Sequence, residues 1–147
     1  MASGVKDLKV WQEAVALGGD VVRAARQVTR RETKVFTDAL MHSAAAVACS
    51  IAHGYASFAA TEQRAAYQEA RRALLDLETR LTIARHAGIL QAPALAQLSG
   101  RITSVSRLLS GYVAYIDRQA AAGTGLPLPM GALTVRTPLA DEPDPTG

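Results

Sequence analysis

Apolar residues recur at gaps of three or four along residues 1–118, which is the spacing of one face of an α-helix. Four such runs cover about residues 7–28, 30–57, 61–86 and 93–118, with short polar or glycine-containing connections between them. Short connections make consecutive helices antiparallel neighbours. The pattern therefore predicts an all-α fold, an antiparallel up-down-up-down four-helix bundle, followed by a separate tail.

The second run is the most apolar part of the chain, and its two faces differ in character. No Asp, Glu, Lys or Arg occurs between Asp38 and Glu62. Large apolar side chains form one stripe, and small ones dominate the opposite side of the helical wheel. Because small side chains let another helix approach closely, we expect the large face to pack inside the subunit and the small face to pack against a neighbouring subunit. The large face holds Phe36, Leu40, Ala44, Val47, Ile51, Tyr55 and Phe58. The predicted oligomer interface holds Ala45, Ala46, Cys49, Ala52, His53 and Ala56.

Each of the other three runs has one apolar seam. Gly18 and Gly19 interrupt the first, each at a cost of up to about 1 kcal/mol relative to Ala, and close approach of a neighbouring helix is the expected compensation. The predicted seam of the first run is Leu8, Trp11, Val15, Gly18, Val22 and Ala25. The seam of the third is Tyr67, Ala70, Leu74, Leu77, Leu81 and Ala84. The seam of the fourth is Leu95, Leu98, Ile102, Val105, Leu109, Tyr112 and Ile116.

Short motifs predict where the helices begin and end. Residues 29–32, TRRE, fit a capping box, in which the Thr oxygen accepts a bond from a backbone N–H and Glu reaches back, so a helix is expected to begin near Arg30. Thr61 predicts the start of the third helix. Gly88 suits the position just after a helix, and Pro93 suits the first turn of the next.

Residues 119–147 differ in composition from the rest of the chain. They hold five of the six prolines and no periodic apolar face, which predicts an irregular, flexible tail. The segment Leu126 to Met130, LPLPM, leaves a second interpretation open, in which it lies extended against a partner groove.

Composition indicates a soluble globular chain rather than a disordered one, with 49% hydrophobic and 20% charged residues. The single Cys excludes an internal disulfide, and the charged opening does not resemble a secretory signal, so we expect a cytoplasmic protein. The uncharged stretch 39–61 raises the alternative of a membrane span. Its Ala, His, Ser and Gly content favours a buried interface helix and no membrane partner.

Positive charge belongs to the helical part of the chain. The formal net charge is +3, and the tail holds Asp141, Glu142 and Asp144 against Arg136. A basic body attracts polyanions, so RNA or DNA is an expected partner. No aromatic residue interleaves with the basic cluster at the first connection, which favours contacts to the nucleic-acid backbone over base stacking. A solvated helix junction is the alternative interpretation of that cluster. The candidate nucleic-acid-binding residues are Arg23, Arg26, Arg30, Arg31, Lys34, Arg71 and Arg72.

No set of residues in the sequence predicts an enzyme. His42, Cys49 and His53 share one helix face, but no further ligand accompanies them, so neither a metal site nor a cofactor is predicted. No nucleophile with a base and an orienting acid is apparent, and phosphate-binding loops and dinucleotide motifs are absent from the sequence.

Four stretches carry a family resemblance. KDLKVWQEAVAL (6–17), FTDAL (36–40), AAAVACSIAHGY (44–55) and LLDLETRLTIARHAGIL (74–90) resemble the bacterial four-helix-bundle proteins of ribosomal RNA intervening sequences. The resemblance spans residues 6–118 and implies an antiparallel four-helix bundle that assembles as a ring, typically a pentamer.

The same family is similar in fold to the accessory variability proteins of diversity-generating retroelements. Those proteins present a basic surface to nucleic acid and partner with a reverse transcriptase. Two functions follow as expectations. The first is a non-enzymatic homo-oligomer, ring-forming and pentameric, that binds RNA or DNA backbone through a basic surface. The alternative is a protein-interaction scaffold acting as the accessory subunit of a retroelement reverse transcriptase.

Overall fold

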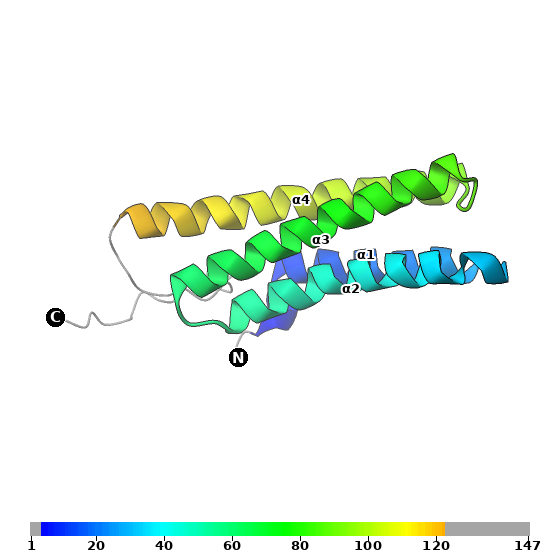
Figure 1. Cartoon of the computed structure of the whole chain (residues 1–147). Helices are drawn as coiled ribbons and strands as arrows, with labels where there is room; N and C mark the ends of the chain where they lie inside the picture. The colour runs from blue at the N-terminus through cyan, green and yellow to red at the C-terminus, as the bar shows by residue number, and fades with distance from the viewer. Residues whose placement is uncertain (1–3, 123–147) are drawn as a thin grey trace.

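Four long helices make up the protein, as the sequence predicts. The computed structural model describes residues 4–122, in which all regular structure is helical. The helices are α1 (Lys9–Arg26), α2 (Lys34–Ala56), α3 (Ala60–His86) and α4 (Ala92–Ala121), with 3-10 turns at Val5–Asp7 and Arg31–Thr33. The helices run up, down, up and down, and α1 also packs on α4, so the bundle closes (Figure 1).

The helices lie as two antiparallel pairs, α1 with α2 and α3 with α4 (Figure 1). The α1–α2 and α3–α4 connections therefore meet at one end of the bundle, and the α2–α3 connection lies at the other. We call the first of these the double-turn end. The basic residues of the first connection and those of the last turn of α3, Arg85 and His86, are thereby brought to the same end of the molecule.

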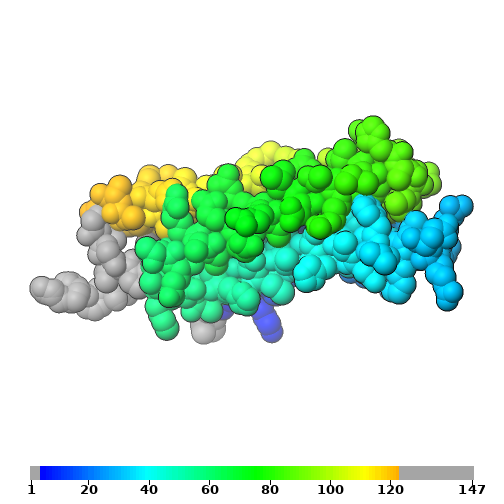
Figure 2. Space-filling view, viewed as in Figure 1, coloured from blue at the N-terminus to red at the C-terminus, as the bar shows by residue number. Residues whose placement is uncertain are grey.

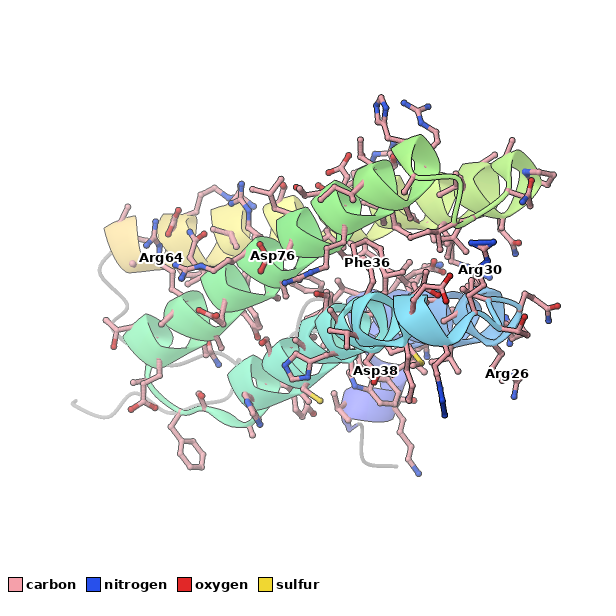
Figure 3. The ribbon with its side chains drawn as sticks, turned by 45° about the vertical axis from the view of Figure 1, so that its right-hand side comes forward. Arg26, Arg30, Phe36, Asp38, Arg64 and Asp76 are labelled. Carbon is pink, nitrogen blue, oxygen red and sulfur yellow. The ribbon has the colours of Figure 1, made fainter. Side chains whose placement is uncertain are left out.

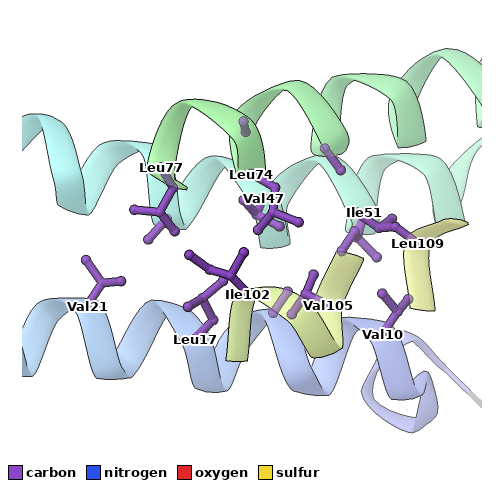
Figure 4. Packing of buried hydrophobic residues seen from close by; sticks show 14 of the residues in the cluster. Val10, Leu17, Val21, Val47, Ile51, Leu74, Leu77, Ile102, Val105 and Leu109 are labelled. Atoms are coloured by element: carbon purple, nitrogen blue, oxygen red, sulfur yellow. The ribbon is translucent and has the colours of Figure 1, made fainter. Parts of the chain in front are cut away.

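The core lies between the helices and confirms three of the predicted seams. Leu40, Ala44, Val47 and Ile51 of α2 are buried, as are all six seam residues of α3 and all of those of α4 except the half-buried Leu95. These side chains interdigitate along the bundle axis (Figure 4). Burying one such large side chain contributes about 1.5–3 kcal/mol. At the edges of the α2 stripe, Phe36 and Tyr55 are half-buried and Phe58 is 81% exposed, since it lies beyond the end of the helix.

The seam predicted for α1 is right at its two ends, where Leu8 and Ala25 are buried, and wrong between them. The buried residues of this helix are Val10, Ala14, Leu17, Asp20, Val21 and Ala25. Of the predicted positions, Val15 and Val22 are 43% and 38% exposed, and Trp11 and Gly18 are half-buried. The helix has apolar residues on two adjacent stripes, and three- and four-residue spacing alone does not select which one faces the core. No atom of the described residues lies within 4 Å of a Cβ placed at Gly18, so the close approach expected there does not occur within residues 4–122.

A close helix approach occurs instead between α2 and α3. A Cβ placed on Gly54 of α2 would come within 2.8 Å of Cδ1 and Cζ of Tyr67 in α3, and closer still to Cε1. The Tyr67 side chain is fully buried. The missing side chain of Gly54 thus provides the space in which the aromatic ring lies.

The helix ends agree with the sequence in part. Gly88 has φ +72°, and the Ile89 N–H donates to the Ala84 carbonyl at 2.8 Å, which is a glycine C-terminal cap. Pro93 lies in the first turn of α4, as predicted. The capping box at residues 29–32 is not formed, because a 3-10 turn precedes α2 and α2 begins at Lys34.

Two further boundaries differ from expectation. The N-cap of α3 is Ala59 rather than Thr61. Helix α4 continues to Ala121, past the expected end near Arg118, because Gln119 and the alanines after it favour helix. The predicted flexible tail, including Leu126 to Met130, lies outside the described residues.

The segment Arg31–Ala56 is long and apolar enough to cross a membrane by length and composition alone. About 33% of its most apolar window is buried inside the bundle. Leu40, Val47 and Ile51 of this segment are core residues, whereas Val35 is 82% exposed.

Gly54→Ala is expected to lower the free energy of unfolding by about 1–3 kcal/mol, because the added methyl group overlaps the buried Tyr67 ring. Gly111→Ala in α4 is the matched control. Nothing lies within 4 Å of a Cβ there, and Ala favours a helix by up to about 1 kcal/mol over Gly. Urea denaturation of the two variants measures both effects, and equal stabilities would contradict the close approach.

Tyr67→Phe is expected to make the protein less sensitive to alkali. Burial, with a smaller contribution from Tyr112, raises the pKa of Tyr67 in the folded state, and its hydroxyl has no hydrogen-bond partner among the described residues. Unfolded tyrosine ionises near pH 10. The stabilisation from the neutral phenol is therefore complete below that pH and is lost as the pH rises above it.

Urea titrations at neutral pH and above pH 10 test this expectation. Tyr67→Phe should retain wild-type stability at neutral pH and lose less of it in alkali. Burial also raises the pKa of Tyr112 to about 12, so part of the loss should remain. Tyr115→Phe, on a half-buried position of α4, is the control and should behave as wild type. An unchanged alkaline loss in Tyr67→Phe would assign that loss to other groups.

Candidate nucleic-acid interface

Four basic residues surround a hollow at the double-turn end. Arg26, Arg30, Arg31 and Lys34 line it, and its volume is about 230 Å³. At about 30 Å³ per water molecule, the space accommodates a phosphate group with several waters. The lining is completed by Ala25, Val28, Thr29, Thr37, Asp38 and Met41. We call this site the basic hollow.

Local backbone structure explains why these four side chains converge. Helix α1 ends at Arg26, where the Gln27 and Val28 N–H groups donate to carbonyls in its last turn. The chain is extended at Arg30 and then makes a 3-10 turn into α2. Reversal of the chain over so few residues brings the last turn of α1 beside the first turn of α2. Residues close in sequence therefore become a cluster in space.

The N-terminus of α2 adds to the positive potential of the basic hollow. Its N-cap residue, Thr33, makes no side-chain capping bond. The Thr33 hydroxyl instead donates to the Arg30 carbonyl at 2.9 Å. The N–H groups of Thr33 and Lys34 donate to the Arg30 and Arg31 carbonyls of the preceding 3-10 turn, so the helix acts through the positive end of its dipole. An anion at this end of the bundle is thus favoured by the helix as well as by the side chains.

The ion pairs around the basic hollow are exposed and weak. Arg30 pairs with Glu32 at 3.5 Å, and Lys34 pairs with Asp38 at 3.2 Å, with all four side chains more than half exposed. Exposed pairs of this kind contribute about 0–1 kcal/mol. Exchanging them for contacts to phosphate therefore has a small cost.

Arg23 lies outside the basic hollow and has a structural contact. It pairs with the buried carboxylate of Asp20, which also accepts a bond from Arg101 Nε of α4 at 2.7 Å. Arg101 reaches Glu13 as well, at 3.3 Å. The hydrogen bond to Asp20 raises the pKa of Arg101 above its ordinary value. Two arginines and two carboxylates thus balance one another between α1 and α4, and the positive charge of Arg23 is used within the fold.

Arg71 and Arg72 also lie apart from the basic hollow. They are exposed in the middle of α3, where they line a separate hollow between α3 and α4. Figure 3 shows Arg26 and Arg30 near one end of the bundle and Arg64, on the first turns of α3, toward the other. Arg85 and His86 instead end α3 at the double-turn end. The antiparallel topology could have predicted that Arg85 and His86 lie at the same end as the α1–α2 connection, because it brings alternate connections to one end of the bundle.

The residues predicted for an oligomer interface lie on the outer side of α2. Ala45, Cys49, His53 and Ala56 are exposed, and Ala46 and Ala52 are half-buried. In Figure 2 the cyan surface of α2 lies open on the face toward the viewer, below α3. Helix α1, which packs against α2, carries a second apolar stripe that includes the exposed residues Val15 and Val22.

Within residues 4–122 no group of three or more His, Cys, Asp or Glu side chains is arranged to hold a metal ion. His42, Cys49 and His53 all lie exposed on α2. The chemistry of the described residues is thus that of charge and apolar surface.

A family model described as 23S rRNA-intervening sequence protein matches residues 6–111. The matched range covers α1 to α3, the basic hollow and most of α4. No curated protein matches the chain.

Proposed function

The chain belongs to the 23S rRNA-intervening sequence protein family, which is not a known family of enzymes. From this premise we propose that the protein is a non-enzymatic homo-oligomer that binds the backbone of RNA or DNA. The observation that carries the proposal is the basic hollow. It combines four cationic side chains with a helix N-terminus that lacks a side-chain cap.

The composition of the basic hollow favours phosphate over base as the group bound. Its lining contains no aromatic ring on which a base could stack. Arginine forms paired hydrogen bonds to phosphate oxygens, and lysine adds a point charge. Contacts of this kind hold a strand in position without reading its sequence. The expected binding is therefore sensitive to salt and tolerant of sequence.

A homo-oligomer is supported by the apolar outer surface of α1 and α2. Trp11, Val15, Gly18 and Val22 recur at gaps of four, three and four, which is the spacing of a helix-packing seam. The described chain leaves this seam partly exposed, next to the helix that carries the small-residue face. Two different faces on one subunit suit a head-to-tail contact, which closes into a ring when the rotation allows. A pentameric ring is the form that we propose, and it repeats the basic hollow around the assembly.

The alternative proposal is a scaffold for a retroelement reverse transcriptase, in which the basic surface recruits an RNA template and the ring docks the polymerase. This alternative depends on the family resemblance of the sequence alone. A reverse-transcriptase gene and a variable repeat beside the gene for this protein would support it, and a neighbourhood without them would count against it.

The double variant Arg30→Gln with Arg31→Gln is expected to show a weaker salt dependence of nucleic-acid binding than the wild-type chain. Each phosphate contact that is lost lowers the slope of log K against log salt by about 0.7 for single strands and about 0.9 for duplex DNA. Fluorescence anisotropy with a labelled single-stranded RNA and a duplex DNA, each over a range of salt, measures the slope. Arg107→Gln with Arg118→Gln removes the same charge from exposed positions of α4 and is the matched control. Equal slopes in the two double variants would contradict the basic hollow as the binding site.

Ala45→Glu is expected to break the oligomer, because it places a charge on the face proposed to pack against another subunit. Ala65→Glu on an exposed position of α3 is the control. Size-exclusion chromatography with light scattering measures the mass of each. The wild-type chain and Ala65→Glu should have the mass of a ring, and Ala45→Glu should have the mass of one chain. A monomeric wild type would overturn the oligomer while leaving nucleic-acid binding to be judged by its own test.

A further inference from the structure

A groove runs along the bundle between α3 and α4. It consists of two hollows of about 330 and 490 Å³ that share Glu78 and Ile102 in their linings. Leu74, Leu81 and Leu95 line its apolar part. Helix α3 packs more extensively on α2 than on α4.

Within residues 4–122, one strongly exposed apolar residue and three arginines without an ion pair lie along this groove, beside core residues such as Leu74 and Leu81. Leu75 lines it and is 62% exposed, and Ile83 on the same helix is 49% exposed. Arg71, Arg72 and Arg85 line it and have no ion pair among the described residues, while Glu78 is the one carboxylate in its lining. A fitting occupant is thus an extended apolar segment followed or preceded by acidic residues.

We propose that residues 126–133 of the same chain, LPLPMGAL, occupy the groove between α3 and α4. This segment follows closely on α4, which ends at Ala121. At about 1.5 Å per helical residue, the groove extends from about 22 Å before that end, at Ser106, to about 44 Å before it, at Ala92. At about 3.3 Å per extended residue, a chain that turns back along α4 reaches from about 13 Å at residue 126 to about 36 Å at residue 133. The apolar segment therefore overlaps the groove in length.

The chemistry of the segment matches that of the groove. Leu126, Leu128 and Leu133 are the large apolar side chains that would enter the hollows, where their burial removes apolar surface from water. Pro127 and Pro129 have no N–H group and restrict the unbound chain, so an extended strand here leaves few donors unpaired and loses less conformational entropy.

The acidic residues that follow match the charge of the groove. The acidic residues after the apolar segment are Asp141, Glu142 and Asp144. The chain between the end of α4 and these residues is long enough for them to lie near Arg85 at the double-turn end. Three carboxylates thereby meet a groove lined by three arginines and one glutamate. Charge complementarity of this kind fixes the direction in which the segment lies.

Disulfide trapping in the full-length chain tests the docked arrangement. In a Cys49→Ser background, Met130→Cys is combined with Ser106→Cys, which lies in the groove lining. The matched control combines Met130→Cys with Gly100→Cys, an exposed α4 position outside the lining where nothing lies within 4 Å of a Cβ. Non-reducing electrophoresis and mass spectrometry in a glutathione buffer follow the rate at which the intrachain disulfide forms.

Docking is expected to make the Ser106→Cys pair react at least about tenfold faster than the control, because it raises the effective concentration of one thiol at the other. Adding Leu126→Ser and Leu128→Ser should reduce the rate to that of the control. Equal rates for the two pairs would overturn the proposal. Disulfides that form between chains instead would also overturn it, and would assign the groove to a segment from a second copy.

Discussion

The contact between Gly54 and the ring of Tyr67 fixes how α2 and α3 lie against each other, and the rest of the bundle follows from it. The Tyr67 ring occupies the space where any residue other than glycine would have a side chain. This contact sets the position of α3 along the axis of α2. From there the seams of both helices remain in register toward the double-turn end. Helix α3 also packs less extensively on α4 than on α2, and the groove lies between α3 and α4.

Most of the bundle could be predicted from the sequence because its signals are periodic and local. Helices α3 and α4 each have one unbroken apolar stripe. Gly88 indicates the end of a helix, and Pro93 indicates the first turn of the next. Helix α1 could not be resolved in this way, since it has two apolar stripes and only packing against a partner decides between them. The capping box failed because a 3-10 turn occupies the position where the pattern requires a helix.

The candidate binding site was predictable to the extent that it is contiguous in sequence. Arg26, Arg30, Arg31 and Lys34 share one connection, so any compact turn brings them together. Arg23 differs because it lies one helical turn after Asp20 and pairs with it. No local sequence pattern indicates that Asp20 is buried. The proposed surfaces also occupy different parts of the molecule. The basic hollow is at one end, and the apolar surface of α1 and α2 is on the side, so assembly and binding need not compete.

The ion-pair network between α1 and α4 joins residues that are distant along the chain, since Arg101 follows Asp20 by 81 positions. The antiparallel hairpins α1–α2 and α3–α4 need only short loops to form, whereas bringing the first and last helices together closes a long one and costs more chain entropy. We infer that this contact forms late during folding, after the hairpins. A late contact chiefly governs the rate of unfolding, so the buried carboxylate of Asp20 would determine how long the closed bundle persists rather than how fast it forms. Folding and unfolding rates of Asp20→Asn would separate these two effects.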